Sequence, residues 1–219
     1  MKTSKDLWQF VKPLIREIET ENGCLIIDDS IEEKPYTDEN DIVCWHFDHS
    51  QGTNVKGINF LSCLYQVASI SLPIGFELIS KTEQYIDPKD LKQKRRSPIS
   101  KNQLARRQLE YAIKNKVKFR FVLFDVWFSS VENLRFILKN RKHFISPLKS
   151  NRKIALCKQD KLQGRWHKLE TLEIQANESR LIYLEGLETP VLLIKQVFTN
   201  ENGQTAVQYL MRQRFKAVN

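Results

Sequence analysis

Two apolar runs in this sequence are each followed directly by aspartate. Residues 24–27, CLII, precede Asp28 and Asp29, and residues 119–124 precede Asp125. Short apolar runs are typical of buried strands, and ligands gather at the carboxyl ends of strands in α/β sheets. Two neighbouring strands would bring these acids together, and paired carboxylates hold two negative charges poorly without a cation. Because Mg²⁺ prefers carboxylate oxygens, the pattern predicts a divalent-metal site.

Each of these acids also has a simpler explanation. A single aspartate after a strand caps a helix or shapes a turn as readily as it binds a metal. Asp125 stands close to Ser129 and Ser130, which predict the start of a helix. The metal hypothesis therefore depends on the two strands together and not on either one.

A third polar group, H-x-D-H, runs from His46 to His49 around Asp48. A transition-metal site is disfavoured because no further His or Cys follows at ligand spacing. We instead expect His46 or His49 to contact phosphate, to orient a carboxylate, or to shape the turn. His49 is included below among the candidates for DNA contact.

Positive charge is concentrated in one stretch of the chain. The formal net charge is +9, which suggests a polyanionic partner, most often nucleic acid. Residues 89–107 hold four Lys and four Arg against one Asp, although a solvated helix face would look similar. The candidates for phosphate contacts, besides His49, are Lys92, Lys94, Arg95, Arg96, Arg106 and Arg107.

Length and composition set the broad class. The chain has 219 residues, of which 41% are hydrophobic, so it can bury a core. No run of about 18 apolar residues predicts a membrane span, and the N-terminus lacks the apolar core of a signal peptide. The four cysteines are scattered without C-x-x-C pairing, which indicates reduced thiols. These features predict a cytoplasmic protein without membrane association.

The elements that would hold the site follow from hydrophobic spacing and turn signals. Residues 81–97 form a charged connection that we expect to be exposed and without regular structure. The expected helices cover residues 4–20, residues 101–116 and the segment after Ser130. In the first of them Ser4 is the expected N-cap, and Pro13 implies a kink or a later start of the helix. The expected strands cover residues 24–27, 42–47, 58–67, 72–79, 118–124 and 143–148. The elements follow the order strand, strand, strand, helix, strand, and an acid ends the first and the last of these strands. This order indicates an α/β fold with a ribonuclease-H-like mixed sheet and flanking helices.

Two blocks of the sequence resemble a known family. The run LIIDDSIEEKPYTDENDIVCWHFDHSQGTNVKGINFLSCLY resembles the first catalytic block of DDE-type insertion-sequence transposases, with its DD[ST], K-P, D-H-S and V-K-G-x-N elements. The run VLFDVWFSS resembles their second block, D-x-W-[FY]-x-S. The resemblance extends from residue 24 to about residue 210.

The resemblance implies site residues and chemistry. Asp29, which directly precedes the Ser, matches the first metal-binding acid of the family, Asp28 is its less favoured neighbour, and Asp125 matches the second. Family members use Asp, Asp and Glu with two Mg²⁺ (or Mn²⁺) ions to cut transposon ends and to join them to target DNA. A homodimer is compatible with this activity.

The third acid of the family, a Glu in a Y-x-x-R-x-x-x-E pattern, has no match here. Tyr209 and Arg212 fit its first half, but residue 216 is Lys. We therefore expect a chain truncated before that Glu, with weak or no activity. The alternative is a non-catalytic DNA-binding remnant that interferes with an intact transposase.

The same resemblance predicts a domain organisation. Residues 1–23 form a helical segment, residues 24–150 an incomplete catalytic core, and residues 151–219 a β-rich insertion. Loss of the Glu-bearing helix would expose the sheet face that carries Leu25, Ile27, Phe121 or Leu123.

Overall fold

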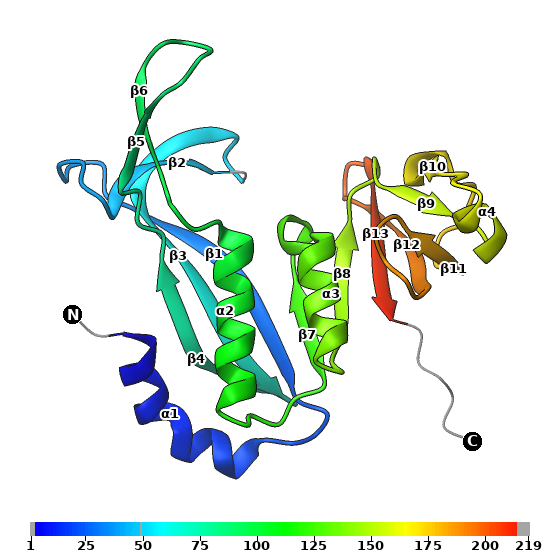
Figure 1. Cartoon of the computed structure of the whole chain (residues 1–219), viewed down its shortest axis with the longest axis horizontal. Coiled ribbons are helices and arrows are strands. Elements are labelled where there is room, and N and C mark those ends of the chain that lie inside the picture. The colour runs from blue at the N-terminus through cyan, green and yellow to red at the C-terminus, as the bar shows by residue number, and fades with distance from the viewer. Residues whose placement is uncertain (1–2, 49, 214–219) are drawn as a thin grey trace. The chain divides into compact units, whose positions relative to one another are not determined.

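The computed structural model describes residues 3–48 and 50–213, which form two compact units, residues 1–119 and 120–219 (Figure 1). Each unit is described by itself. Both combine strands with few helices, and a mixed sheet is present, so the predicted α/β class is confirmed at that level. No described helix is long and apolar enough to cross a membrane. The predicted division at residues 23 and 150 stays a prediction.

One long strand organises the sheet of the first unit. β3 (Thr53–Val67) pairs antiparallel with β1 (Cys24–Glu33) along one edge. Along its other edge it pairs first with β2 (Val43–Asp48) and then with β4 (Ile70–Leu78). Both β3 and β4 were predicted as strands, and the structure joins them in an antiparallel hairpin. Alternate residues of β3 are buried, which is the pattern of a strand with one covered face.

Helices α1 (Ser4–Ile18) and α2 (Lys101–Lys114) pack on this sheet, as predicted. Thr3, and not Ser4, caps α1, and Asp6 completes its capping box. Ser4 lies in the first turn, where its hydroxyl accepts a hydrogen bond from the Phe76 N–H. Pro13 lies inside α1 without ending it. The N-cap was assigned wrongly because Thr and Ser are both good caps and only the helix start distinguishes them.

Helices α1 and α2 cover the sheet face that carries Leu25 and Ile27, which the sequence predicted to be exposed. Leu25 and Ile27 of β1 are 0% and 1% exposed, so the predicted exposure of these two residues is wrong. The expectation assumed that a further helix was needed there, whereas α1 and α2 already contact the sheet, and Trp8 of α1 meets Tyr111 of α2 edge to face.

Residues 81–97 are not an irregular connection, which corrects the prediction. They form a hairpin of β5 (Glu83–Ile86) and β6 (Gln93–Arg96) that projects from the first unit (Figure 1). Cross-strand charge pairing, such as the Arg96–Glu83 ion pair, supports it in place of an apolar face. Apolar alternation does not predict this hairpin, because charged and polar side chains pair across it.

The second unit begins with a parallel strand pair. β7 (Phe121–Phe124) and β8 (His143–Leu148) are joined by the 3₁₀ turn η1 (Val126–Phe128) and helix α3 (Val131–Lys139). Ser130 caps α3, and both that helix and β8 were predicted. The apolar run predicted a buried strand, but β7 is fully buried on one face only: Val122 and Phe124 are buried, whereas Phe121 and Leu123 are partly exposed.

The rest of the second unit is β-rich, as predicted for residues from 151 onward. The sheet continues from β7 and β8 through four strands, in the order β13, β12, β11 and β9, and ends at the short strand β10. All these later pairings are antiparallel, so the sheet is mixed. The bounds are β9 (Lys153–Ala155), α4 (Lys158–Leu162), β10 (His167–Lys168), η2 (Leu169–Thr171), β11 (Ser179–Leu184), β12 (Val191–Thr199) and β13 (Thr205–Gln213).

Candidate active site

The register of β1 against β3 decides which way the two neighbouring aspartates point. Asp29 lies opposite Leu61, and Asp28 lies opposite Ser62. Directly opposed residues share a face of the sheet, so Asp29 lies on the face of the buried Leu61. Asp28 lies on the other face and is exposed. Only Asp29 therefore points toward the helix-covered side of the first unit.

Neither aspartate ends its strand, which corrects the sequence prediction. β1 continues to Glu33, which pairs with Gly57. The strand extends past the acids because β3 begins at Thr53, earlier than predicted, and supplies pairing partners for the polar residues. The apolar run marks the buried part of the strand and not its length.

Asp29 already has a cationic partner. Its Oδ2 accepts a hydrogen bond from Lys101 Nζ at 2.5 Å. Lys101 is the first residue of α2, and the Ser100 cap holds the helix start in place. The two side chains are 19% and 27% exposed, so the ion pair is partly withdrawn from solvent. The helix that covers the sheet thus brings a positive charge to the carboxylate.

Asn59 of β3 is the second neighbour of Asp29. Its Nδ2 lies 3.4 Å from Asp29 Oδ2. The side chain is fully buried, and its Oδ1 has no hydrogen-bond partner among residues 3–48 and 50–213. Leaving a buried acceptor unpaired costs on the order of 1–3 kcal/mol. The amide nitrogen of Asn59 faces Asp29, and the buried Oδ1 is an acceptor that a cation could satisfy.

The donor set fits a hard divalent cation. Carboxylate and amide oxygens are the ligands that Mg²⁺ and similar ions prefer. Within the described ranges, no group of three or more His, Cys, Asp or Glu side chains is placed to hold a metal ion. Asp29 and Asn59 would supply two oxygen ligands to such an ion, and metal binding here stays a prediction.

His46 is buried near this pair. It is 5% exposed, and its Nε2 lies 3.4 Å from Cys44 Sγ. Burial, followed by the charges of Lys81 and Lys101, lowers the pKa of His46 to about 4, against the opposing effect of Asp29. The imidazole is therefore neutral at pH 7. A buried neutral ring on the inner side of β2 is unsuited to direct contact with phosphate.

The remainder of the H-x-D-H group shapes a turn. Asp48 Oδ1 accepts hydrogen bonds from the backbone N–H and the hydroxyl of Ser50, and these bonds lower the pKa of Asp48. This agrees with one of the three roles considered for the group. His49 lies outside the described residues, so its predicted contact with DNA stays a prediction.

Asp125 belongs to the second unit and has a different environment. It follows β7 directly, as predicted, and is exposed. Its Oδ1 accepts hydrogen bonds from the backbone N–H groups of Trp127 at 2.9 Å and Phe128 at 3.4 Å. The carboxylate therefore caps η1, which is the simpler role that the sequence allowed. Its convergence with Asp29 stays a prediction.

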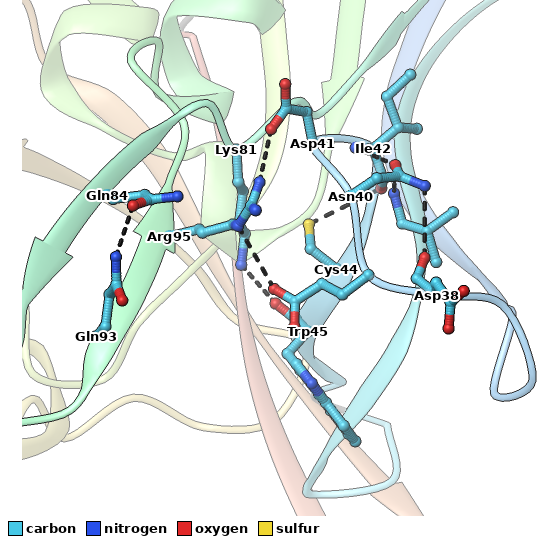
Figure 2. A network of polar contacts seen from close by, with 12 residues as sticks. Asp38, Asn40, Asp41, Ile42, Cys44, Trp45, Lys81, Gln84, Gln93 and Arg95 are labelled. Carbon is cyan, nitrogen blue, oxygen red and sulfur yellow. Dashed lines mark hydrogen bonds and ion pairs between the residues drawn. The ribbon is translucent and has the colours of Figure 1, made fainter.

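Three of the basic candidates for DNA contact have acidic partners within the chain. Arg95 pairs with Asp41 at 2.6 Å, and Figure 2 shows its guanidinium reaching across to the loop before β2. Lys94 pairs with Asp87 and Asp90, and Arg96 pairs with Glu83. Exposed pairs of this kind are weak, so phosphate could replace the carboxylates.

The other three basic candidates lie on the same hairpin or on α2. Lys92 lies on the hairpin just before β6, Arg106 is half-buried on α2, and Arg107 is exposed on the same helix. DNA contact by these six side chains stays a prediction.

Sequence reasoning missed Asn59 and Lys101. A signal was present for Asn59, because it is the last residue of the V-K-G-x-N block that the transposase resemblance uses. Lys101 gave no signal, because a lysine after a helix cap is common, and it contacts Asp29 across 72 residues of sequence.

Comparison with known families supports the reading of both sequence blocks. A family model described as DDE superfamily endonuclease matches residues 5–170, which include Asp29, Asn59, Lys101 and Asp125. No curated protein matches the chain. Because the family match covers well over half of the sequence, this chain belongs to the DDE superfamily of endonucleases.

Proposed function

We propose that the chain is a catalytic domain of the DDE transposase type, with a ribonuclease-H-like core, that cuts DNA with the help of two divalent ions. The observation that carries the proposal is the position of Asp29. Its carboxylate lies on the covered face of the sheet, next to the buried Asn59, whose Oδ1 has no hydrogen-bond partner in the described part of the chain, and the chain is of an endonuclease family. In the proposed active arrangement Asp29 and Asp125 are the first two metal ligands, and the ions are Mg²⁺ or Mn²⁺.

The reaction is hydrolysis of one phosphodiester bond. The oxygen of water forms a bond to phosphorus, the bond from phosphorus to the 3′ oxygen breaks, and the 3′ oxygen takes a proton to become a free hydroxyl. In strand transfer, the oxygen of that hydroxyl forms a bond to a phosphorus of target DNA, the target's own bond from phosphorus to the 3′ oxygen breaks, and that 3′ oxygen takes up the proton. When bound, two metal ions would supply the charge that activates the attacking oxygen and stabilises the leaving oxygen.

The residues of this chain have defined parts in that chemistry. Asp29 would hold a ligand oxygen on a rigid, fully paired strand, which is a better platform than a loop. Lys101 would balance the charge of Asp29 before a metal ion arrives. The third acid of the family is unassigned, so we propose that this chain by itself cuts DNA slowly.

A second candidate is favoured by the Lys101–Asp29 ion pair. A carboxylate already neutralised by an ammonium group binds a divalent ion less readily, because the metal must first displace the lysine. The chain would then bind DNA without cutting it and would interfere with an intact transposase by occupying DNA ends.

The test is nicking of supercoiled plasmid by the purified chain with Mg²⁺, Mn²⁺ or EDTA, beside the variant Asp125→Asn. Metal-dependent nicking that disappears in the variant supports the nuclease. Salt-sensitive DNA binding without nicking, in both proteins, supports the second candidate. Nicking that persists in EDTA or in the variant contradicts the proposed site.

A further inference from the structure

A second site is outlined by a cavity of about 960 Å³ in the first unit, between β2 and the β5–β6 hairpin. This volume is at the upper end of the range of about 300–1,000 Å³ for ligand pockets. Its lining includes Trp45, Phe47 and Tyr85 but none of Asp29, Asn59 and Lys101. The cavity is therefore distinct from the candidate metal site.

Two large aromatic side chains of β2 line this cavity and are exposed. Trp45 is 53% exposed and Phe47 is 49% exposed, although their strand neighbours Cys44 and His46 are buried. Alternation along a strand places Trp45 and Phe47 on the opposite face from those two residues. The strand thus directs its apolar rings to solvent at a position where polar residues would be expected.

Cations line the same cavity as the rings. Lys81 Nζ donates a hydrogen bond to the carbonyl oxygen of Trp45 at 2.5 Å, which holds the ammonium at the cavity wall (Figure 2). Lys92, Lys94 and Arg95 line the same cavity from the hairpin. Among the lining residues described, Glu39 is the one carboxylate. Lys94 and Arg95 are paired with carboxylates, so Lys81 and Lys92 supply the excess of positive charge at the wall.

Amide side chains complete the lining. Gln84 and Gln93 are diagonal neighbours across the hairpin, and Gln93 Nε2 donates a hydrogen bond to Gln84 Oε1 at 2.6 Å (Figure 2). Asn54 lies opposite Phe47 in the β2–β3 pair. Amides offer both donors and acceptors, which suits the edges of nucleobases.

We propose that this cavity binds unpaired nucleotides of a DNA strand, with bases stacked on Trp45 and Phe47 and phosphates on Lys81 and Lys92. Exposed aromatic faces interleaved with cations are the usual means of binding single strands, because stacking needs bases that are out of the duplex. A duplex presents its phosphates but not its base faces, so it would use the lysines alone. The inference rests on the proposed DNA-directed function, although it concerns a separate site.

The experiment compares binding of a fluorescein-labelled 15-nucleotide single strand with that of the blunt duplex of the same sequence, at fixed salt and in EDTA. Trp45→Ala is expected to weaken single-strand binding about tenfold, since one base–aromatic stack is lost, and to change duplex binding less than about twofold. Phe47→Ala should act in the same direction, and Trp45→Phe should restore most of the affinity. Tyr36→Ala is the matched control, because Tyr36 is fully exposed and does not line the cavity.

A lysine pair provides a second control. Lys92→Ala should weaken binding of both DNAs, whereas Lys89→Ala, on the same hairpin but outside the lining, should weaken neither by more than about twofold. The inference is overturned if the Trp45 and Tyr36 variants bind the single strand equally, or if Trp45→Ala weakens both DNAs to the same extent. Binding of mononucleotides as tightly as of the 15-mer would also overturn it.

Nicking is measured on the same preparations in Mn²⁺. Stacking that depends on Trp45 in a protein that never nicks supports the cavity and counts against the nuclease. Nicking by a protein whose single-strand binding does not depend on Trp45 supports the nuclease and counts against the cavity. Thermal unfolding of each variant within a few degrees of the parent shows that the lost binding is local.

Discussion

Asp29 and Asp125 follow similar apolar runs in the sequence but occupy different surroundings in the protein. Asp29 lies within a paired strand, is half-buried, and bonds to the side chains of Lys101 and Asn59. Asp125 lies after its strand, is exposed, and bonds to backbone N–H groups of η1. The difference teaches that one sequence pattern produces two kinds of acid, one held by tertiary contacts and one held by its own turn.

The largest expected effect is loss of nicking when either acid is neutralised. Asp29→Asn and Asp125→Asn should each reduce metal-dependent nicking at least about a hundredfold, because the charge that binds the ion is lost. The unfolding temperature separates the two sites. Asp29→Asn should lower the unfolding temperature, because Lys101 loses its anion, whereas Asp125→Asn should preserve it, because asparagine retains the cap. Equal unfolding temperatures would contradict the comparison, and Asp28→Asn, on the exposed face, is the control.

The pH dependence of the free energy of unfolding should come from His46, which is buried near Asp29. The pKa of His46 is lowered to about 4 in the folded state from an ordinary value near 6.5, so the unfolded chain binds the proton more tightly. His46 therefore contributes stability that is complete above pH 6.5 and is lost as the pH falls toward 4.

The size of that contribution is about 1–3 kcal/mol in the free energy of unfolding. Urea unfolding at pH 7 and pH 5 measures it. His46→Asn should flatten the difference, and His167→Asn, at an exposed position, should preserve it. An unchanged difference in the His46 variant would show that other groups carry the pH dependence.

Lys101 should make metal binding at Asp29 harder. Lys101→Met removes the competing ammonium and retains the aliphatic stem, so the Mn²⁺ concentration at half-maximal stabilisation should fall several-fold. Lys114→Met is the matched control, since it removes an exposed ion pair with Glu110 in the same helix. A rise in the required Mn²⁺ concentration would mean that Lys101 positions the carboxylate instead of competing for it.

The smallest effect concerns the cap at Asp125. Asp125→Ala removes the acceptor for the Trp127 N–H and should lower the free energy of unfolding by about 0.5–1 kcal/mol, whereas Asp125→Asn should change it by a few tenths. Thermal unfolding without metal measures both. If the two variants were equally stable, the cap would have no energetic role, and the contrast with Asp29 would rest on burial alone.

Much of the fold could be predicted because it is encoded locally. Helix α2, helix α3 with its Ser130 cap, strand β8 and the β12–β13 hairpin all follow from spacing, caps and turn residues within about 20 positions. The β5–β6 hairpin was missed because charge pairs support it instead of an apolar stripe. The length of β1 was missed because its polar end is held by pairing with β3.

By itself, the sequence determined the types of acid available, the basic character of the chain, most of the elements, and the resemblance to DDE transposases that the family match supports. The tertiary structure decided that Asp29, and not Asp28, faces the covered side, and that Lys101 and Asn59 meet it. The physical reason is register. A strand alternates its side chains with a period of two, so the face of each aspartate depends on how β1 aligns with a strand about 30 residues away. No local pattern specifies that alignment, which requires the packed sheet and the helix that covers it.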